Sequence, residues 1–244
     1  MKIAGSIVVV TGTNRGIGRA YVEALVARGA KKIYATARKP EALAALANAH
    51  PGKIETFALD VTDAKSVAAA AARTRDITLL INNAGVNHNI GLLSAPDLSG
   101  AREEMETNYF GTLAMCRAFA PVLKANGGGT ILVMLSILAR VNLPLMGSLC
   151  ASKAAELSLV QGVRAELAKQ GTHVIGVMPG AVDTDMTRNL PPPKMQPVDV
   201  VRAALDGVEQ GAEEVYPGDM ASGVAQGLAS DPKAVEKQFA AILP

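Results

Sequence analysis

Tryptophan is absent from this sequence, and aromatic residues as a whole make up only 3% of its 244 residues. A buried core must therefore be built mainly from aliphatic side chains and methionine, which the 49% of hydrophobic residues can supply. Cysteine is almost absent too, since Cys116 and Cys150 are the only two. Two cysteines are too few for a disulfide framework or a cysteine-rich metal site, so we expect reduced thiols and no metal.

Blocks of like charge and long apolar runs are also missing. The net charge is +2 with 19% charged residues, which excludes the basic surface typical of nucleic-acid-binding proteins. The longest apolar stretch, Ile131 to Leu143, contains Ser136 and Arg140 and is too short to span a bilayer. The start, Met1 to Val10, has the pattern of a first strand rather than of a signal peptide. We expect a cytoplasmic protein without nucleic-acid or membrane partners.

What the sequence does contain is an alternation of short apolar runs and helix-length segments. We predict strands over Ser6–Val10, Lys32–Thr36, Ile54–Leu59, Thr78–Ile81, Thr130–Leu135, His173–Val177 and Glu214–Tyr216. We predict helices over Gly16–Arg28, Pro40–Ala49, Ala64–Thr74, Leu98–Lys124, Gly147–Lys169, Pro197–Gly207, Met220–Leu228 and Pro232–Leu243. Several strands are apolar at every position, as in parallel strands covered on both faces. The pattern predicts an α/β fold with one doubly wound parallel sheet of about seven strands and helices on both faces.

A glycine-rich turn lies between the first predicted strand and the first predicted helix. It runs Thr11-Gly12-Thr13-Asn14-Arg15-Gly16-Ile17-Gly18. Glycines at such a turn let the backbone approach a phosphate closely, and the helix N-terminus that follows offers free N–H groups to a pyrophosphate. The turn and its position predict a dinucleotide site.

The residues after the second strand indicate which dinucleotide binds. NAD-binding folds usually place an acidic residue there, on the ribose 2′-hydroxyl. This strand instead ends Ala35-Thr36-Ala37-Arg38-Lys39. Arg38, together with Arg15 in the turn, can bind a 2′-phosphate through charge-assisted hydrogen bonds, although two exposed basic side chains without a ligand are the alternative. We predict NADP(H) rather than NAD.

Further motifs follow in order along the chain. Asn82-Asn83-Ala84-Gly85 ends the fourth predicted strand, Thr107-Asn108-Tyr109 lies in the long helix after it, and Ser136 ends the fifth strand. Lys153 and Pro179-Gly180 come next. Together with the turn, these motifs resemble the short-chain dehydrogenase/reductase family over essentially the whole chain. The resemblance implies a single NAD(P)-binding Rossmann-type domain over residues 1–244.

For the cofactor, the resemblance implies contacts beyond the glycine-rich turn. These are Asp60 and Val61 at the adenine, Asn83, Ala84 and Gly85 along the cofactor, Lys153 at the nicotinamide ribose, and Pro179, Gly180, Val182 and Thr184 at the nicotinamide carboxamide.

For catalysis, the resemblance implies a site made of Asn108, Ser136, residue 149 and Lys153. In the family, a hydride moves between the nicotinamide and a carbonyl carbon while a tyrosine gives the oxygen a proton. The lysine lowers the pKa of that tyrosine, the serine holds the carbonyl and the asparagine positions a water. The expected activity is that of an NADP(H)-dependent carbonyl reductase or alcohol dehydrogenase.

The tyrosine of this site is replaced by Leu149. This leucine precedes Lys153 by four residues, on the same helix face, and its interval from Ser136 matches that of the family's serine and tyrosine. Leucine supplies neither a proton nor a hydrogen bond, and losing a general acid costs roughly 10²–10⁴-fold in rate. We expect carbonyl reduction to be impaired or absent in this sequence. His88 is the candidate substitute donor, although a solvated loop histidine is the favoured interpretation.

The substrate side of the predicted site is apolar. Residues there are Leu138, Leu143, Leu145, Met146, Leu149 and Met186, for which core packing is the alternative role. They indicate an apolar ketone, aldehyde or secondary alcohol. The proline-rich loop from Asp183 to Pro197 follows a strand and suits a lid over a binding site.

Three functions stay open at this point. The chain is a short-chain reductase whose tyrosine has been replaced, or a natural enzyme with other proton chemistry or a non-redox reaction, or a non-catalytic NADPH-binding protein. The helices predicted over Leu98–Lys124 and Gly147–Lys169 resemble those through which the family forms dimers and tetramers. We therefore expect a homodimer or homotetramer.

Overall fold

The protein is described by a computed structural model of residues 1–244, in which seven strands form one parallel sheet. The strands are β1 (Ile7–Val10), β2 (Lys32–Ala37), β3 (Ile54–Ala58), β4 (Leu79–Asn82), β5 (Gly129–Met134), β6 (Thr172–Val177) and β7 (Glu214–Val215). Their order across the sheet is β3-β2-β1-β4-β5-β6-β7. All strands are parallel, but β2 and β3 lie on one side of β1 and β4 to β7 on the other. The order in which strands are added thus reverses between β1 and β4, and ligands of such sheets bind at this switch point. The predicted α/β fold class is confirmed.

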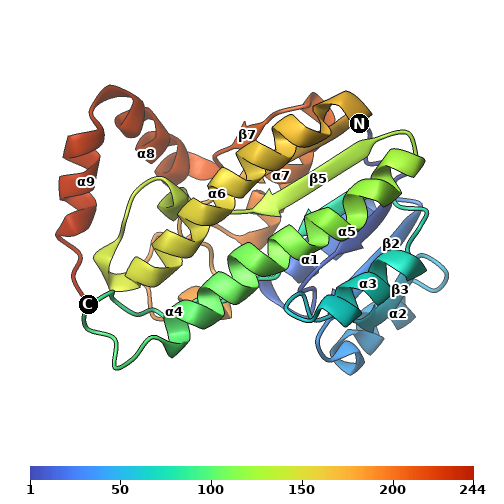
Figure 1. The fold of residues 1–244 in the computed structure, drawn as a ribbon, viewed down its shortest axis with the longest axis horizontal. Helices are drawn as coiled ribbons and strands as arrows, with labels where there is room; N and C mark the ends of the chain where they lie inside the picture. Colours follow the sequence, from blue (N-terminus) through green and yellow to red (C-terminus); the bar gives the residue numbers. More distant parts are fainter.

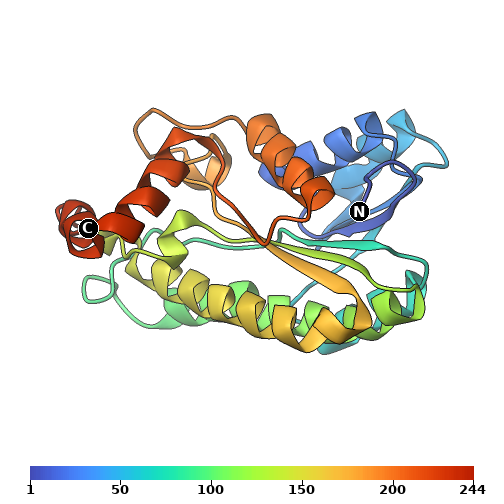
Figure 2. The same ribbon diagram turned by 90° about the horizontal axis from the view of Figure 1, so that it is seen from above.

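Helices cover both faces of the sheet (Figures 1 and 2). They are α1 (Gly16–Ala27), α2 (Ala44–Ala49), α3 (Ala64–Arg73), α4 (Ser99–Glu104), α5 (Thr112–Ala125), α6 (Gly147–Leu167), α7 (Pro197–Gln210), α8 (Gly218–Ser230) and α9 (Pro232–Ala240). Short turns of tighter or wider helix are η1 (Pro40–Leu43), η2 (Met105–Gly111), η3 (Ile137–Ala139), η4 (Pro144–Met146), η5 (Ala168–Gln170) and η6 (Asp185–Thr187). Figure 2 shows α1 and α7 on one face and α5 and α6 on the other.

Each face of the sheet has its own hydrophobic core. The core under α1 and α7 is aliphatic apart from the fully buried Tyr21. The core under α3, α5 and α6 has Phe119 as its largest fully buried side chain. Both cysteines are buried and unpaired. None of the helices has the length and apolar character that a membrane crossing requires.

The prediction of one continuous helix over Leu98–Lys124 is wrong in the middle of that range. The segment consists of α4, a π-helical segment η2 and α5. Two contacts explain the wider turn. Asn108 turns inward to bond Val86, and Gly111 packs so closely that an added Cβ would lie 2.7 Å from Val61 Cγ2. Single π turns inside helices frequently occur at functional sites.

Other boundaries differ from the sequence-based prediction for simpler reasons. The segment predicted as a helix over Pro40–Ala49 starts as the tighter turn η1, with Pro40 at its first position. Helix α7 continues past Gly207 to Gln210 and ends where Gly211 adopts the left-handed conformation. Helix α9 ends at Ala240 rather than at Leu243.

The loop from Asp183 to Pro197 is tied down at its base. Val182 pairs with Met195 in an isolated bridge, and the Asp183 N–H donates to the Met195 carbonyl at 2.8 Å. The turn η6 follows within the loop. The loop therefore extends from a fixed base beside the carboxyl ends of β1 and β6.

Candidate active site

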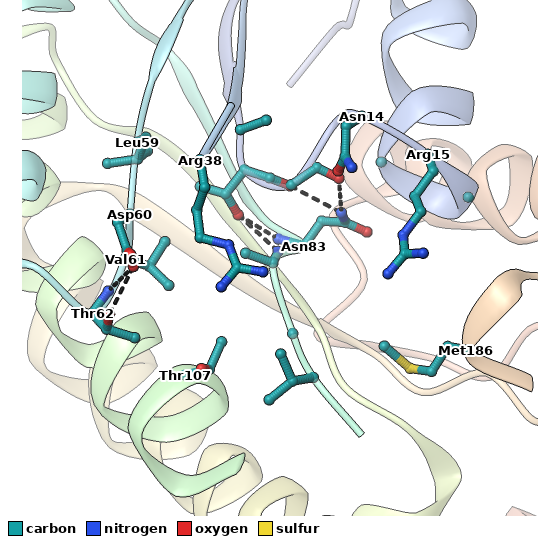
Figure 3. A pocket seen from close by; sticks show the side chains of 18 of the residues that line it. Asn14, Arg15, Arg38, Leu59, Asp60, Val61, Thr62, Asn83, Thr107 and Met186 are labelled. Atoms are coloured by element: carbon teal, nitrogen blue, oxygen red, sulfur yellow. Dashed lines mark hydrogen bonds between the residues drawn. The ribbon is translucent and has the colours of Figure 1, made fainter. Parts of the chain in front are cut away.

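A cavity of about 1230 Å³ opens at the carboxyl ends of the strands around the switch point (Figure 3). Its wall comes from the glycine-rich turn, from the segments after β2, β3 and β4, from α4 and η2, and from η6. The predicted cofactor residues that line it are Gly12, Asn14, Arg15, Gly16, Ile17, Gly18, Arg38, Asp60, Val61, Asn83, Ala84, Gly85 and Thr184. The structure thus brings most of the predicted cofactor residues into one cavity, whereas none of the four predicted catalytic residues, Asn108, Ser136, Leu149 and Lys153, lines it.

The glycine-rich turn leaves no room for a side chain at Gly12 or Gly18. A Cβ added to Gly18 would lie 2.1 Å from the Gly12 carbonyl oxygen, and one added to Gly12 would lie 3.0 Å from Ala84 Cα. Helix α1 begins after Arg15 with no side chain capping its first N–H groups. Those free donors and the positive end of the helix dipole face the cavity end where a phosphate would bind.

The Asn83 side chain holds this turn in place. Its Nδ2 donates to the Thr11 carbonyl at 2.9 Å and to the Gly12 carbonyl at 3.2 Å. In return, Thr11 Oγ1 accepts from the N–H groups of Asn83 and Ala84, both at 2.9 Å. The segment after β4 is therefore fastened to the turn after β1, and some of these bonds are drawn in Figure 3.

Two arginines enter the cavity from different elements, as Figure 3 shows. Arg38 comes from the end of β2 and is exposed. Arg15 lies 3.2 Å from the Asp185 carboxylate of η6. Arg188 contacts the same carboxylate at 2.5 Å, and these two cations, Arg188 first, lower the pKa of Asp185.

Asp60 faces the same cavity from the end of β3. Its carboxylate accepts from the hydroxyl of Thr62 at 2.7 Å and from the backbone N–H of Thr62 at 3.0 Å. These two hydrogen bonds lower the pKa of Asp60, which therefore remains an acceptor at neutral pH.

Asn108 is the fixed point of the predicted catalytic group. Its Oδ1 accepts from the Val86 N–H at 2.9 Å, while its Nδ2 donates to the Val86 carbonyl at 3.1 Å and to Ser152 Oγ at 3.0 Å. The Ser152 hydroxyl donates in turn to the Leu149 carbonyl at 2.8 Å. This network links the segment after β4 to the first turns of α6.

Lys153 lies beside this network and is buried. A Cβ added to Gly85 would lie 3.2 Å from Asn108 Oδ1 and 3.9 Å from Lys153 Nζ. The Lys153 ammonium donates to the Met134 carbonyl at 2.8 Å and to Glu156 Oε2 at 2.6 Å. Sequence reasoning did not include Glu156 in the site.

Ser136 and Leu149 complete the predicted group. Ser136 caps η3 by accepting from the Leu138 N–H at 3.1 Å, and its residue is partly exposed. Helix α6 packs against η3, which brings the start of α6 next to Ser136. Leu149 is 7% exposed, so a buried apolar side chain occupies the predicted tyrosine position in the first turn of α6.

A sequence model of the short chain dehydrogenase family matches residues 6–194. The chain belongs to this family. The zebrafish Danio rerio protein "Dehydrogenase/reductase SDR family member 7B" is 33% identical over 200 residues, which cover 77% of this chain and 64% of that protein. Sorbitol dehydrogenase of Cereibacter sphaeroides is 36% identical over 192 residues, covering 75% of this chain and 73% of that protein.

A solved structure is similar over nearly the full length of both chains. It is a short chain dehydrogenase from Burkholderia cenocepacia J2315 in complex with NADP, with 51% sequence identity and a TM-score of 0.93. The match covers 98% of this chain and 99% of the other. The short-chain dehydrogenase fold, with its seven-stranded parallel sheet, therefore applies to this chain as a whole.

Some residues assigned to the cofactor from the family resemblance do not line the cavity. Thr13 is fully buried, and its hydroxyl donates to the Thr36 carbonyl at 3.1 Å, which fastens the turn to β2. Val182 is buried under the proline-rich loop, and Gly180 packs against Met220. Pro179 accepts from the Ile137 N–H at 3.0 Å through its carbonyl. Lys153 also lies outside this cavity wall.

His88, the candidate substitute proton donor, contacts side chains of α4. Its ring Nε2 lies 3.0 Å from Glu103 Oε2, and its backbone N–H donates to Glu104 Oε1 at 2.7 Å. Both partners are on α4, and the residue is exposed. The interpretation as a solvated loop histidine fits these contacts.

The wall of the cavity formed by α4 and η2 was not predicted from the sequence. Arg102, Glu103, Glu106 and Thr107 line it from α4 and η2. The sequence offers one sign of this wall, because Thr107 stands next to Asn108 in the motif. The π turn then places Thr107 on the cavity wall.

Proposed function

We propose that this chain is an NADP(H)-dependent short-chain carbonyl reductase or alcohol dehydrogenase in which Leu149 occupies the place of the proton donor. The observation that carries the proposal is the placement of Asn108 and Lys153 at Gly85, next to a dinucleotide-sized cavity, with a buried leucine where a hydroxyl is needed. Reduction is then slow as the sequence stands.

The cavity fits NADP(H) at three places. The glycine-rich turn suits the pyrophosphate because it lines the cavity and leads into the uncapped N–H groups at the start of α1. The Asp60 carboxylate is an acceptor on the adenine side, and Arg38 and Arg15 offer guanidinium groups to a 2′-phosphate. The complex of the Burkholderia cenocepacia relative with NADP supports the same choice. Bound NADPH supplies the hydride.

The protein's own residues then have separate tasks. Ser136 offers a hydroxyl to the carbonyl oxygen, and Asn108 holds the segment after β4 against α6. Lys153 carries protons on the α6 face that also carries Leu149. Because leucine gives no proton, the alkoxide oxygen must take its proton from water.

The substrate in this proposal is an apolar ketone, aldehyde or secondary alcohol. Leu138, Leu143 and Leu145 are partly exposed around the start of α6, and Met186 is 43% exposed on η6. Leu149 adds to this apolar wall.

We further propose that the chain forms a homo-oligomer. Leu98 and Phe110 are 64% and 49% exposed, and together with Met105 they line a shallow groove on α4 and η2. The other residues that line the groove are Ala101, Arg102 and Glu106. Such a groove is commonly covered in an assembly. Light scattering after gel filtration tests this, and a monomer at micromolar concentration contradicts it.

The experiment for the activity compares the chain with Leu149→Tyr and Leu149→Phe. NADPH oxidation is followed against a panel of apolar ketones and aldehydes at high enzyme concentration. We expect the tyrosine variant to be faster than the other two by about 10²-fold or more, because only it adds a general acid. The phenylalanine variant controls for ring volume.

Two outcomes contradict the proposal. Equal activity of the leucine and tyrosine forms shows that the proton comes from elsewhere, and His88→Ala then tests the remaining candidate. No turnover by any form, combined with tight NADPH binding, favours a binding protein.

A further inference from the structure

Lys153 forms a buried ion pair with Glu156, and the proposed reaction gives Glu156 no role. The two side chains are only 10% and 1% exposed, and Nζ lies 2.6 Å from Oε2. The second oxygen of Glu156 accepts from the Thr112 hydroxyl at 2.8 Å. The carboxylate is thus held from both sides, by α6 and by α5.

Burial distinguishes this pair from similar pairs on the surface. Lys233 and Glu236 have the same spacing along a helix and the same 2.6 Å distance, but they are 76% and 60% exposed. Water screens that surface pair, whereas a buried pair interacts at low dielectric and needs nearly complete hydrogen bonding. In the buried pair, the Met134 carbonyl takes a further proton of the ammonium.

Other ionisable groups around Lys153 do not take over the role of Glu156. Burial raises the pKa of the Cys116 thiol on α5 to about 12 and also raises that of Cys150 on α6, so both are neutral at physiological pH. Glu104 on α4 is fully buried and accepts from the His88 N–H. Glu156 is the carboxyl group in direct contact with the ammonium. Burial raises the pKa of Glu156, and the Lys153 charge and the hydrogen bonds from Lys153 and Thr112 oppose that rise.

We propose that Glu156 is a positioning residue that neutralises and retains the Lys153 ammonium in a site that has no tyrosine. The inference rests on the proposed function. A tyrosine at position 149 needs the full charge of Lys153 to lower its pKa, and here that charge is shared with a carboxylate. A leucine at position 149 needs no such charge, and an unpaired ammonium next to it would be costly to bury.

A measurable consequence follows for a tyrosine introduced at position 149. With Glu156 present, its hydroxyl faces a neutralised pair and keeps a high pKa. With Glu156→Gln, its hydroxyl faces an unpaired ammonium and its pKa falls, because a nearby opposite charge stabilises the tyrosinate. Glu156 therefore limits how much activity Leu149→Tyr restores.

The test is an ultraviolet titration of tyrosinate at its absorption near 295 nm, which is favourable because the chain has no tryptophan and only four tyrosines. Burial raises the pKa of Tyr21, Tyr34 and Tyr216, which moves their signals to higher pH. Subtracting the titration of Leu149→Phe from that of Leu149→Tyr isolates residue 149. The same difference is measured with Glu156→Gln in both proteins. We expect the tyrosinate midpoint to be lower by about one pH unit or more in the Glu156→Gln pair.

Three further variants make the result specific. Glu236→Gln removes the exposed counterpart and is expected to leave the midpoint unchanged. Glu156→Asp keeps the negative charge and is expected to move the midpoint less than glutamine does. If Glu156→Gln does not fold by circular dichroism, Thr112→Val takes its place. Loss of the Thr112 bond favours protonation of Glu156, which leaves more charge on Lys153 and lowers the midpoint.

The outcomes separate this inference from the proposed function. The titration uses no substrate, so a lower midpoint supports the role of Glu156 even if no form of the protein reduces a carbonyl. An unchanged or higher midpoint after Glu156→Gln, or after Thr112→Val where that variant replaces it, overturns the role of Glu156. That result leaves the activity of Leu149→Tyr to decide the proposed function.

Discussion

At position 149 the backbone rather than the side chain takes part in the hydrogen-bond network of the candidate site. The hydrogen bond that ties Ser152 to this position goes to the Leu149 backbone carbonyl, and Ser152 then joins Asn108. Replacing the side chain therefore leaves the network around Asn108 and Val86 intact. Leu149→Tyr therefore tests the proposed reaction without removing any of these hydrogen bonds, while the pairing of Lys153 with Glu156 limits the activity that we expect it to restore.

Arg38 is expected to decide between the two dinucleotides. Arg38→Ala removes a guanidinium that makes charge-assisted hydrogen bonds to a 2′-phosphate, whereas an unmodified ribose offers it only neutral hydroxyl groups. We expect NADPH to bind about tenfold more weakly or worse, with NADH affinity nearly unchanged, because a hydrogen bond to a charged group contributes about 1.5–3 kcal/mol. Isothermal titration with both cofactors measures the change.

Arg19, which is exposed on α1 and does not line the cavity, offers a matched control for Arg38. Arg19→Ala also removes an exposed arginine, one that pairs with Glu23 at 2.9 Å along α1. Its loss should affect both cofactors alike and only slightly. If Arg38→Ala weakens NADH as much as NADPH, the guanidinium does not recognise the 2′-phosphate.

Between elements, the Arg15–Asp185 pair connects the turn before α1 with η6 in the proline-rich loop. Both side chains are largely exposed, so this bridge contributes little to folding. Because the pKa of Asp185 is lowered, the bridge is intact at neutral pH and is lost only as the pH falls through that lowered value. Its effect belongs to ligand binding, since Asp185 competes with a phosphate for Arg15.

Asp185→Asn should therefore tighten NADPH binding. The change frees Arg15 and removes a negative charge from the cavity wall, and we expect about a two- to fivefold lower Kd, diminishing at high salt. Fluorescence titration of bound NADPH at two ionic strengths measures it. Asp199→Asn, which breaks the exposed Arg202 pair on α7, is the control. Weaker binding after Asp185→Asn indicates instead that the bridge holds the loop closed over the cofactor.

The elements differ in how far the sequence predicts them. The strands were predictable because β4 and β5 consist almost entirely of apolar residues and end at recognisable motifs. The π turn η2 was not, since it arises from Asn108 and Gly111 meeting other parts of the chain. The contact between Thr112 and Glu156 could not be predicted either, because it joins two helices that are distant in sequence.

For the molecule as a whole, the cofactor site spans both sides of the switch point of the sheet. The cavity wall takes residues from the segments after β1 to β4 and also from η6 after β6, so a bound dinucleotide contacts elements that are far apart in sequence. Ligand binding to the folded state alone should then stabilise the entire domain.

This coupling is testable by thermal unfolding, followed by circular dichroism because the chain has no tryptophan to report by fluorescence. At a NADPH concentration of about 100 times Kd, binding adds about 2.7 kcal/mol. For a domain of this size, that corresponds to a rise in Tm of about 5 to 10 °C. NADH at the same concentration should give a clearly smaller rise, and Arg38→Ala should remove the difference between the two cofactors. Equal shifts from both cofactors with the unaltered protein would show that the arginines do not select NADP(H), because the stabilisation follows the affinity of each cofactor for the folded state.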